Sequence, residues 1–198
     1  SYQDVGFSYT TEQLRKKKFS GYIFVGGPPA MALAAVMPLP EGLSELLFAA
    51  ALGRRAVRMI SRRQTEDGQN CPSHNLSIHA DADFCISGTI DASHTKPEGP
   101  FGDHTGLYSQ PDEYPVFHLT CLTRRKRPTY LTTVVGVPPM EDYYLGVASE
   151  RIFLPIIRKT LPEIVDMHFP AEGIFHNLVL VSIDKRYPGH ARKIMNAF

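Results

Sequence analysis

Short apolar segments separated by turn residues constrain the fold of this chain more strongly than any other feature. After Ala56 these segments are bounded by Gly, Pro, Asn or Asp, and they cover residues 57–60, 76–79, 84–90, 116–122 and 130–137. Apolar segments of this length with turn residues at both ends are typical of antiparallel β-strands. The middle of the chain is therefore predicted to form an antiparallel sheet or barrel, with a polar loop at residues 61–73.

Helices are predicted on both sides of this region. On the amino-terminal side we expect a helix at 10–18, a strand at 21–25, and helices at 30–36 and 43–54. On the carboxyl-terminal side we expect a helix at about 141–159 with an interruption at Pro155, strands at 164–169 and 174–183, and a last helix from Gly189. This order predicts one α+β unit in which helices flank a barrel or sandwich of strands.

The charge balance excludes functions that need a strongly basic or acidic surface. The chain has 198 residues, with 21 Lys and Arg against 20 Asp and Glu, and its formal net charge is +1. Broad binding to nucleic acid or to an anionic membrane surface is therefore not expected. The basic run Arg124–Arg127 is interpreted as a solvated hairpin tip, because no stripe of aromatic residues accompanies it.

Neither a membrane span nor a disulfide framework is predicted. The longest uncharged run, Gly21–Pro40, is broken by glycines and prolines that would leave backbone groups unpaired in lipid, which favours a soluble protein. Cys71, Cys85 and Cys121 are odd in number and widely spaced, so they predict neither a disulfide framework nor a thiolate zinc site. This cysteine usage favours a reducing cytoplasm.

One segment concentrates groups that are suited to acid–base chemistry. Residues 98–106 contain two carboxylates five positions apart, Glu98 and Asp103, followed by His104, with glycines at three turn positions. In an apolar pocket two like charges move their pKa values apart, so that one acid keeps a proton for donation. A strand connection in which Asp103 caps turn amides explains the same residues. The residue types alone do not choose between a general acid and a turn cap.

A second carboxylate stands out in the helix predicted at 43–54. From Glu45 to Leu52 every residue except Glu45 is apolar, and a helix that is apolar on all faces is expected to be buried. A partly buried Glu45 must be neutralised by a proton, a basic side chain or a cation. The alternative is that Glu45 faces solvent and interacts with the helix dipole at the amino end.

Several motifs along the chain match one family pattern. They are Gly-Gly-Pro-Pro-Ala at 26–30, Met-Pro-Leu-Pro at 37–40, Glu-Gly-Pro-Phe-Gly-Asp-His-Thr-Gly at 98–106 and Gly-Val-Pro-Pro-Met-Glu-Asp at 136–142, with further segments at 150–155, 162–166, 172–177 and 185–191. With these motifs the chain, from about Tyr22 onward, resembles the UbiD decarboxylases. These are the 3-polyprenyl-4-hydroxybenzoate and related aryl or acrylic acid decarboxylases that use prenylated FMN.

The resemblance implies a fold and a set of site residues. The fold is a split β-barrel of the flavin-reductase type with antiparallel strands and flanking helices. Asp103 stands at the position of the proton donor, and Glu98 belongs to the same network of acids and arginine. Glu45 matches a glutamate that helps to bind a divalent metal, usually manganese. Met37 and Pro38 lie where the family packs against the cofactor and supplies backbone oxygens to a monovalent cation such as K⁺.

The resemblance also implies an activity. It is the non-oxidative, reversible decarboxylation of an aromatic or α,β-unsaturated carboxylic acid, for example in ubiquinone biosynthesis. The modified flavin acts as an electron sink, and Asp103 protonates the carbon that has lost CO₂. The implied partners are the small-molecule carboxylic acid substrate and a prenyl-flavin synthase that supplies the cofactor. The implied location is cytoplasmic.

The sequence departs from the family pattern near its amino-terminal end. Ser1–Gly21 contains no match to an upstream Asn and His that complete the family's metal site, or to an Arg that pairs with the two acids. We therefore expect a single central domain over residues 1–198, without most of the N-terminal domain and all of the C-terminal domain, that is inactive by itself. The alternative is a non-catalytic flavin-binding or subunit-interaction module on a split barrel. Unpaired strand edges favour its self-association into a homo-oligomer.

Overall fold

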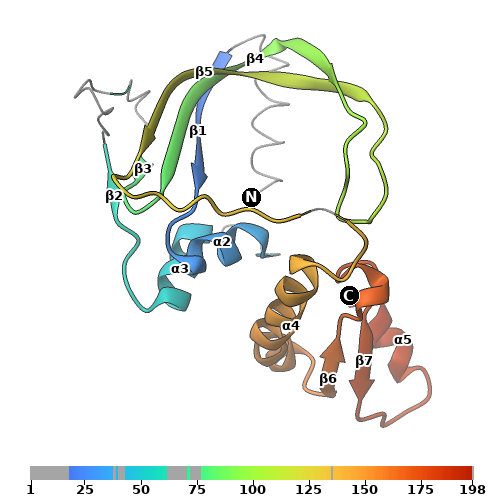
Figure 1. The fold of residues 1–198 in the computed structure, drawn as a ribbon. Helices are drawn as coiled ribbons and strands as arrows, with labels where there is room; N and C mark the ends of the chain where they lie inside the picture. Colours follow the sequence, from blue (N-terminus) through green and yellow to red (C-terminus); the bar gives the residue numbers. More distant parts are fainter. Residues whose placement is uncertain are drawn as a thin grey trace. The chain divides into compact units, whose positions relative to one another are not determined.

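The computed structural model describes residues 18–37, 39, 43–61, 71, 77–134 and 136–197. The chain divides into two compact units. Unit 1 consists of Ser1–Gly99 and Gln110–Thr132, and unit 2 consists of Pro100–Ser109 and Thr133–Phe198 (Figure 1). The loop at 100–109 therefore leaves the sheet of unit 1 and belongs structurally to unit 2.

An antiparallel sheet of three strands forms the centre of unit 1. Its strands are β1 (Lys18–Val25), β4 (Phe84–Glu98) and β5 (Asp112–Arg124), in the order β1-β4-β5. Apolar residues set the register, with Ile23 opposite Ile86 and Ile86 opposite Leu122. The β4–β5 register shifts between Ser87 and Gly88 and again between Ile90 and Thr95. Bulges of this kind bend a strand, and Figure 1 shows the long β4–β5 ribbon strongly curved.

A tight turn connects β1 to the helices of unit 1. The Asp83 carboxylate accepts a hydrogen bond from the Gly27 amide at 2.7 Å and another from the Thr129 amide at 3.1 Å. Gly26 has a φ of +72°, and a Cβ at this position would lie 2.4 Å from an Asp83 oxygen. Only glycine fits here, because the backbone must both adopt a left-handed conformation and approach Asp83 closely.

Two helices and two short strands complete the described part of unit 1. The helices are α2 (Pro29–Val36) and α3 (Glu45–Gly53), which pack against each other, and the strands β2 (Met59–Ile60) and β3 (Ile78–His79) pair in antiparallel fashion. The prediction that α3 is buried on all faces is wrong. Ala49 is buried, but the Leu47 side chain is 67% exposed. An apolar composition does not reveal which of its faces another element covers.

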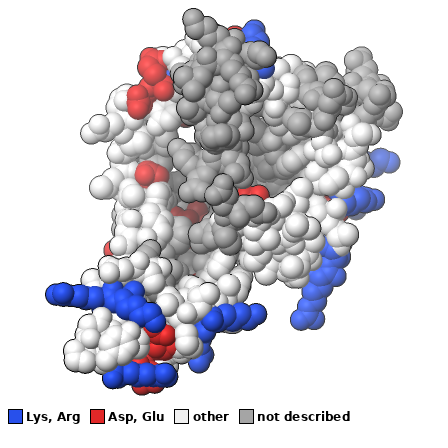
Figure 2. Space-filling model, turned by 180° about the vertical axis from the view of Figure 1, so that it is seen from behind, with Lys and Arg blue, Asp and Glu red and all other residues white. Residues whose placement is uncertain are grey.

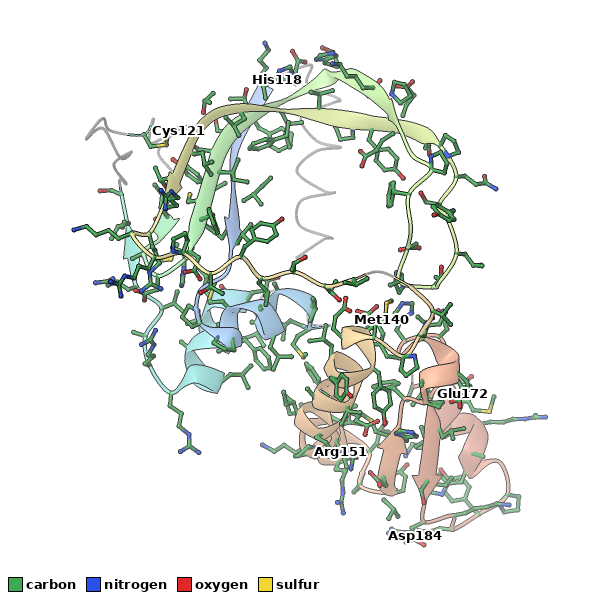
Figure 3. The ribbon with its side chains drawn as sticks, in the orientation of Figure 1. His118, Cys121, Met140, Arg151, Glu172 and Asp184 are labelled. Carbon is green, nitrogen blue, oxygen red and sulfur yellow. A yellow bond between two sulfur atoms is a disulfide. The ribbon has the colours of Figure 1, made fainter. Side chains whose placement is uncertain are left out.

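The cysteines differ from the expectation of no disulfide. Cys71 and Cys121 form a disulfide across 50 positions of sequence, and Cys85 is a buried free thiol. Cys121 lies on β5 (Figure 3). The Ser87 hydroxyl donates to the Cys121 carbonyl at 3.1 Å and lies 3.0 Å from the Cys71 sulfur. Cys71 belongs to no strand, so its approach to Cys121 is a long-range contact that the spacing of the cysteines along the chain does not reveal.

Unit 2 contains two helices, a helical turn and a two-stranded antiparallel sheet. In chain order these are α4 (Glu141–Thr160), β6 (Ile164–His168), the 3₁₀ turn η1 (Ala171–Gly173), β7 (Leu180–Ile183) and α5 (His190–Met195). α4 continues through Pro155 and packs against β6. The buried Glu150 carboxylate on α4 accepts a hydrogen bond from the Phe169 amide at 2.8 Å and lies 3.1 Å from His168 Nδ1. Arg151, labelled in Figure 3, pairs with Asp166 on β6 at 2.9 Å.

The predicted element order is largely confirmed. The structure confirms the strand after residue 20, the helices at 30–36, 43–54 and 141–159, and the last helix. The strand predicted at 130–137 is wrong, because residues 129–134 have no regular structure and pair with no strand of the described chain. The strand predicted from 174 begins only at Leu180. The helix predicted at 10–18 lies outside the described residues, except that Lys18 begins β1.

The result is an α+β fold with antiparallel sheets. The described strands form open sheets of three, two and two strands, so the split barrel stays a prediction. On the face shown in Figure 2 the described basic and acidic side chains form no large patch of a single sign. None of the helices in the described residues is both long enough and apolar enough to span a membrane.

Candidate functional site

The two carboxylates predicted to work together belong to different units. Glu98 is the last residue of β4 in unit 1, is exposed, and has Asp112 as its cross-strand partner. Asp103 lies in the loop that belongs to unit 2. The pairing of Glu98 with Asp103 in one site therefore stays a prediction, and the described geometry around Asp103 comes from unit 2 alone.

The loop that carries Asp103 is closed by its own backbone. The Asp103 amide donates to the Leu107 carbonyl at 2.9 Å, and the Gly106 amide donates to the Asp103 carbonyl at 3.0 Å. Gly102 and Tyr108 form an antiparallel bridge beyond this turn. Gly106 has a φ of +82°, a conformation that other residues rarely adopt. The glycine pattern seen in the sequence thus builds a turn that presents the Asp103 side chain.

A chain of hydrogen bonds extends from the Asp103 carboxylate. Asp103 Oδ1 accepts from the His104 amide at 2.8 Å and lies 2.8 Å from His104 Nδ1. The other ring nitrogen, His104 Nε2, lies 2.9 Å from His176 Nε2. His176 Nδ1 in turn lies 3.1 Å from the side-chain oxygen of Asn177. A carboxylate, two imidazoles and an amide thus form one connected series.

The electrostatics of this series separate two acids. The hydrogen bonds from the His104 ring and amide hold the pKa of Asp103 below its usual value, so Asp103 is a carboxylate at neutral pH. Asp142 behaves in the opposite way. Burial raises the pKa of Asp142, with Glu141 adding to the rise, while His104 and His176 oppose it. One Asp142 oxygen is buried without a hydrogen-bond partner among the described residues.

A small cavity lies beside this acid–imidazole series. Its lining includes His104, Pro138, Met140, Asp142 and Phe175. Met140, labelled in Figure 3, is the residue that precedes α4. A carboxyl group with a raised pKa and an imidazole therefore face a common space whose remaining walls are mainly apolar.

Strained backbone holds His176 in this arrangement. Ile174 and Phe175, just before His176, have φ values of 49° and 52°. Positive φ is unfavourable for residues other than glycine, most of all for a β-branched one, and such strain concentrates at functional sites. Phe175 packs where Gly146 of α4 has no side chain, since a Cβ on Gly146 would lie 2.6 Å from the Phe175 Cβ. The α4 helix thus fixes the position of the residue that precedes His176.

The predicted cofactor and metal residues lie in unit 1. Met37 directly follows α2 and is 4% exposed, and its carbonyl accepts a hydrogen bond from the Leu39 amide at 2.9 Å. Its side chain is therefore already covered by the fold of unit 1. Pro38 lies outside the described residues.

Glu45 occupies the first turn of α3, where the Ser44 side chain accepts a hydrogen bond from the Leu46 amide at 3.2 Å. Glu45 is half-buried, which fits both a metal ligand and a group that interacts with the helix dipole. The described residues contain no group of three or more His, Cys, Asp or Glu side chains that could hold a metal ion. By themselves they do not form a manganese site.

Two residues of the site in unit 2, His176 and Asp142, were not predicted from the sequence. His176 is 72 positions from His104, and no pattern in the sequence links the two. Asp142 follows another acid at the start of a helix, a place where carboxylates are common for reasons of helix stability alone. The one signal that points to them is that both residues fall inside motifs that match the family pattern.

Comparisons with known proteins relate both units to one family. Residues 4–138 match the 3-octaprenyl-4-hydroxybenzoate carboxy-lyase Rift-related domain, and residues 143–198 match the C-terminal domain of the same carboxy-lyase. The boundary between the two matches falls at the start of α4. The second match differs from the expectation of a single central domain that lacks all of the C-terminal domain.

Relatives from several organisms match along almost the whole chain. A protein of Archaeoglobus fulgidus is 49% identical over 88% of this chain, which corresponds to 34% of its own length. A protein of Aquifex aeolicus is 45% identical over 99% of this chain and 39% of its own length. Both carry the name uncharacterized protein. The chain thus spans between a third and two fifths of the length of these relatives.

Solved structures support the fold. The UbiD-class enzyme HmfF from Pelotomaculum thermopropionicum in complex with FMN has a TM-score of 0.78 at 24% identity, with 98% of this chain and 41% of that chain covered. An evolved dimeric form of HmfF in complex with prFMN has a TM-score of 0.78 at 25% identity, over 96% of this chain and 42% of that chain. The closed form of vanillic acid decarboxylase from Sedimentibacter hydroxybenzoicus has a TM-score of 0.80 at 22% identity, with 98% of this chain and 39% of that chain covered. The two domain matches together with this fold show that the chain belongs to the UbiD family of carboxy-lyases.

Proposed function

We propose that this chain is part of a prenylated-FMN-dependent carboxy-lyase. The reaction is the non-oxidative, reversible removal of CO₂ from an aromatic or α,β-unsaturated carboxylic acid. Membership of the UbiD family supports the reaction class, and FMN or prFMN in the two HmfF structures supports the flavin. The observation that carries the proposal is the Asp103 carboxylate, which lies in the loop at residues 100–109 and accepts hydrogen bonds from His104.

Asp103 is the proposed proton donor. Loss of CO₂ leaves an electron pair on carbon, and an acid must protonate that carbon to complete the reaction. Asp103 suits this role because it is 41% exposed, so a substrate can reach it, and because hydrogen bonds to His104 fix its orientation. Glu98 is the proposed second acid, which would help to hold the substrate and Asp103 in the catalytic arrangement.

The flavin would supply the electron sink for the decarboxylation step. In this chain Met37 and Pro38 are the residues proposed to lie against it and to supply backbone oxygens to K⁺. Glu45 is proposed as one ligand of a manganese ion whose other ligands come from outside the described residues. A prenyl-flavin synthase would provide the cofactor, and the cytoplasm is the proposed compartment. Self-association is proposed from the open sheet edges and from the dimeric form of HmfF.

Replacement of the proposed donor tests the function. Asp103→Asn, made in the flavin-loaded protein that contains this sequence, should lower the turnover of carboxylic acids by about 1000-fold, the range in which a general acid contributes. The flavin absorbance should stay unchanged. Asp184→Asn is the matched control, since Asp184 is a 61% exposed acid of the same unit that pairs with Arg186 at 3.0 Å. Retained turnover in Asp103→Asn would refute the assignment of the donor.

The metal ligand needs a separate experiment. Glu45→Gln should reduce the manganese bound per protein, measured by elemental analysis after the same purification. Gln keeps the size and the helix position of Glu but binds a hard cation much more weakly. An unchanged manganese content would favour the helix-dipole role of Glu45. A wild-type protein that binds flavin and releases no CO₂ from any acid tested would favour the non-catalytic flavin-binding module.

A further inference from the structure

The hydrogen-bonded series in unit 2 has a direction that follows from its donors and acceptors. A carboxylate only accepts hydrogen bonds, so the proton between Asp103 and His104 belongs to His104 Nδ1. In a neutral imidazole the other nitrogen then carries no proton, so His104 Nε2 accepts. His176 Nε2, at 2.9 Å, must be the donor. The protons of the two rings therefore both point toward Asp103.

The far end of the series can take up a proton. With the proton of neutral His176 on Nε2, its Nδ1 is an acceptor. The 3.1 Å contact of Nδ1 is to Asn177 Oδ1, so an accepting Nδ1 requires the Asn177 amide turned by 180°, with its NH₂ group toward the ring. A protonated Nδ1 would instead donate to the amide oxygen, and rotation of the amide by 180° serves either state. The His104–His176 and His176–Asn177 contacts both lie in exposed surroundings, so water reaches this nitrogen.

Two acids lie within electrostatic reach of both imidazoles. His104 and His176 both interact electrostatically with Asp103 and with Asp142, and Glu141 acts on Asp142 as well.

The state of Asp103 creates the need for a proton source. His104 keeps the pKa of Asp103 below its usual value, so the resting group is ionised at neutral pH. An ionised carboxylate has no proton to give to a substrate. Under the proposed decarboxylase function, each turnover must therefore deliver a proton to Asp103 before or while the carbon is protonated.

We propose that His104 and His176 relay protons from solvent to Asp103. The Asp103 carboxylate takes the Nδ1 proton of His104 and passes it to the carbon that has lost CO₂, so that Asp103 returns to its ionised state. His104 Nε2 then takes the Nε2 proton of His176, and His176 Nδ1 takes a proton from water. One solvent proton enters for each CO₂ released, and rotation or reverse exchange of the imidazole protons restores the starting state. The relay rests on the proposed function, with His104 and His176 as positioning residues for Asp103.

Imidazole NMR tests the direction of the relay without turnover. Long-range ¹H–¹⁵N spectra of the chain should show His104 protonated at Nδ1 and His176 at Nε2. Asp103→Asn should remove the tautomer preference of His104. The control is His118→Asn on β5 (Figure 3), which breaks a similar imidazole pair with His94 in unit 1, where Nδ1 and Nε2 lie 3.1 Å apart. This control should leave His104 unchanged, and the opposite tautomer at either ring would overturn the relay.

Turnover tests whether the relay is used. In the flavin-loaded protein, His176→Asn should lower kcat by about 10-fold with KM unchanged, less than the loss of the acid itself. The pH profile of kcat should shift, and added imidazole should restore part of the rate. Wild-type kcat in His176→Asn, or a loss that imidazole does not rescue, would overturn the relay. Failure of the wild type to turn over any acid would instead refute the proposed function, and the NMR result would still decide the direction of the series.

Discussion

Two of the carboxylate–imidazole pairs in unit 2 differ in burial. Glu163 and His190 lie 2.9 Å apart, with side chains 5% and 3% exposed. Asp103 and His104 lie 2.8 Å apart, with side chains 41% and 38% exposed. In both pairs the imidazole contributes to a lowered carboxyl pKa. The same two groups can therefore serve different purposes, and burial together with the second ring nitrogen decides which.

The second ring nitrogen distinguishes the pairs most clearly. His190 Nδ1 accepts from the Arg186 amide at 3.2 Å, and the Tyr187 ring stacks on the imidazole with centroids 4.2 Å apart. Lys193 forms a further ion pair with Glu163. Both ring nitrogens of His190 thus have partners within the fold. The contacts of Glu163 with His190 and Lys193 connect α5 to the residue that precedes β6. His104 Nε2 instead continues to a second, exposed imidazole.

The largest expected effect comes from removing the buried carboxylate. Glu163→Leu should lower the thermal unfolding midpoint strongly, because it leaves the His190 ring N–H and the Lys193 ammonium without this acceptor. Glu163→Gln keeps an acceptor and should lose less. Thermal melts by circular dichroism measure both.

Asp103→Leu is the matched exposed variant for this comparison. Removal of the Asp103 carboxylate leaves the His104 imidazole and the His104 amide, which water can solvate. The thermal unfolding midpoint should therefore change little. Equal losses from the buried and the exposed carboxylate would break the distinction between a structural pair and a proton-transfer pair.

The next largest expected effect on stability comes from a larger side chain beside Phe175, the residue that precedes His176. Gly146→Ala places a methyl group 2.6 Å from the Phe175 Cβ, so the backbone at Phe175 or the α4 helix must shift. Overpacking of this kind costs about 1–3 kcal/mol of unfolding free energy. The shift should also displace His176, the next residue, and change its imidazole NMR signals, whereas the signals of His190 should stay in place.

A second glycine gives the control for this substitution. Gly136 also belongs to unit 2, and a Cβ there would meet nothing within 4 Å. Gly136→Ala should therefore leave the unfolding free energy and both imidazole pairs almost unchanged. A loss of stability in Gly146→Ala without any change at His176 would contradict the role of Phe175 in positioning that imidazole.

The difference between the two pairs also explains what the sequence could predict. The glycines and acids of residues 98–106 are neighbours along the chain, so the turn and the Asp103–His104 pair follow from local chemistry. Contacts between distant residues depend on the fold, and sequence spacing does not reveal them. Two such contacts between distant residues are the His104–His176 hydrogen bond and the Cys71–Cys121 disulfide.

The backbone shows the same limit. The alternation of apolar residues predicts the central parts of β4 and β5, but their polar ends, out to Glu98 and Asp112, pair through the backbone ladder alone. The strand expected from residue 174 fails because Ile174 and Phe175 adopt positive φ, which neither residue type indicates. Tertiary contacts with α4 decide the conformation there, and these contacts form the part of the site that the sequence did not predict.

The smallest expected effect is the pH dependence of the buried pair. Hydrogen bonds from Lys193 and His190 lower the pKa of Glu163 from 4.5 to about 2. A carboxyl with a lowered pKa in the folded state stabilises the fold fully above its unfolded pKa, and this contribution is lost as the pH falls through the folded value. The stabilisation by Glu163 should therefore be complete above about pH 5 and disappear between about pH 4.5 and 2.

Urea unfolding of the wild type and of Glu163→Gln at a series of pH values measures this contribution. The difference between the two midpoints should be constant near neutral pH and shrink as the pH falls below about 4.5, because the wild-type carboxyl then becomes protonated and resembles the neutral amide. The same comparison for Asp103→Asn should show a small difference throughout, since solvent screens the exposed pair. A difference for Glu163→Gln that persists unchanged to about pH 2 would mean that shape, rather than charge, makes the buried pair stabilising.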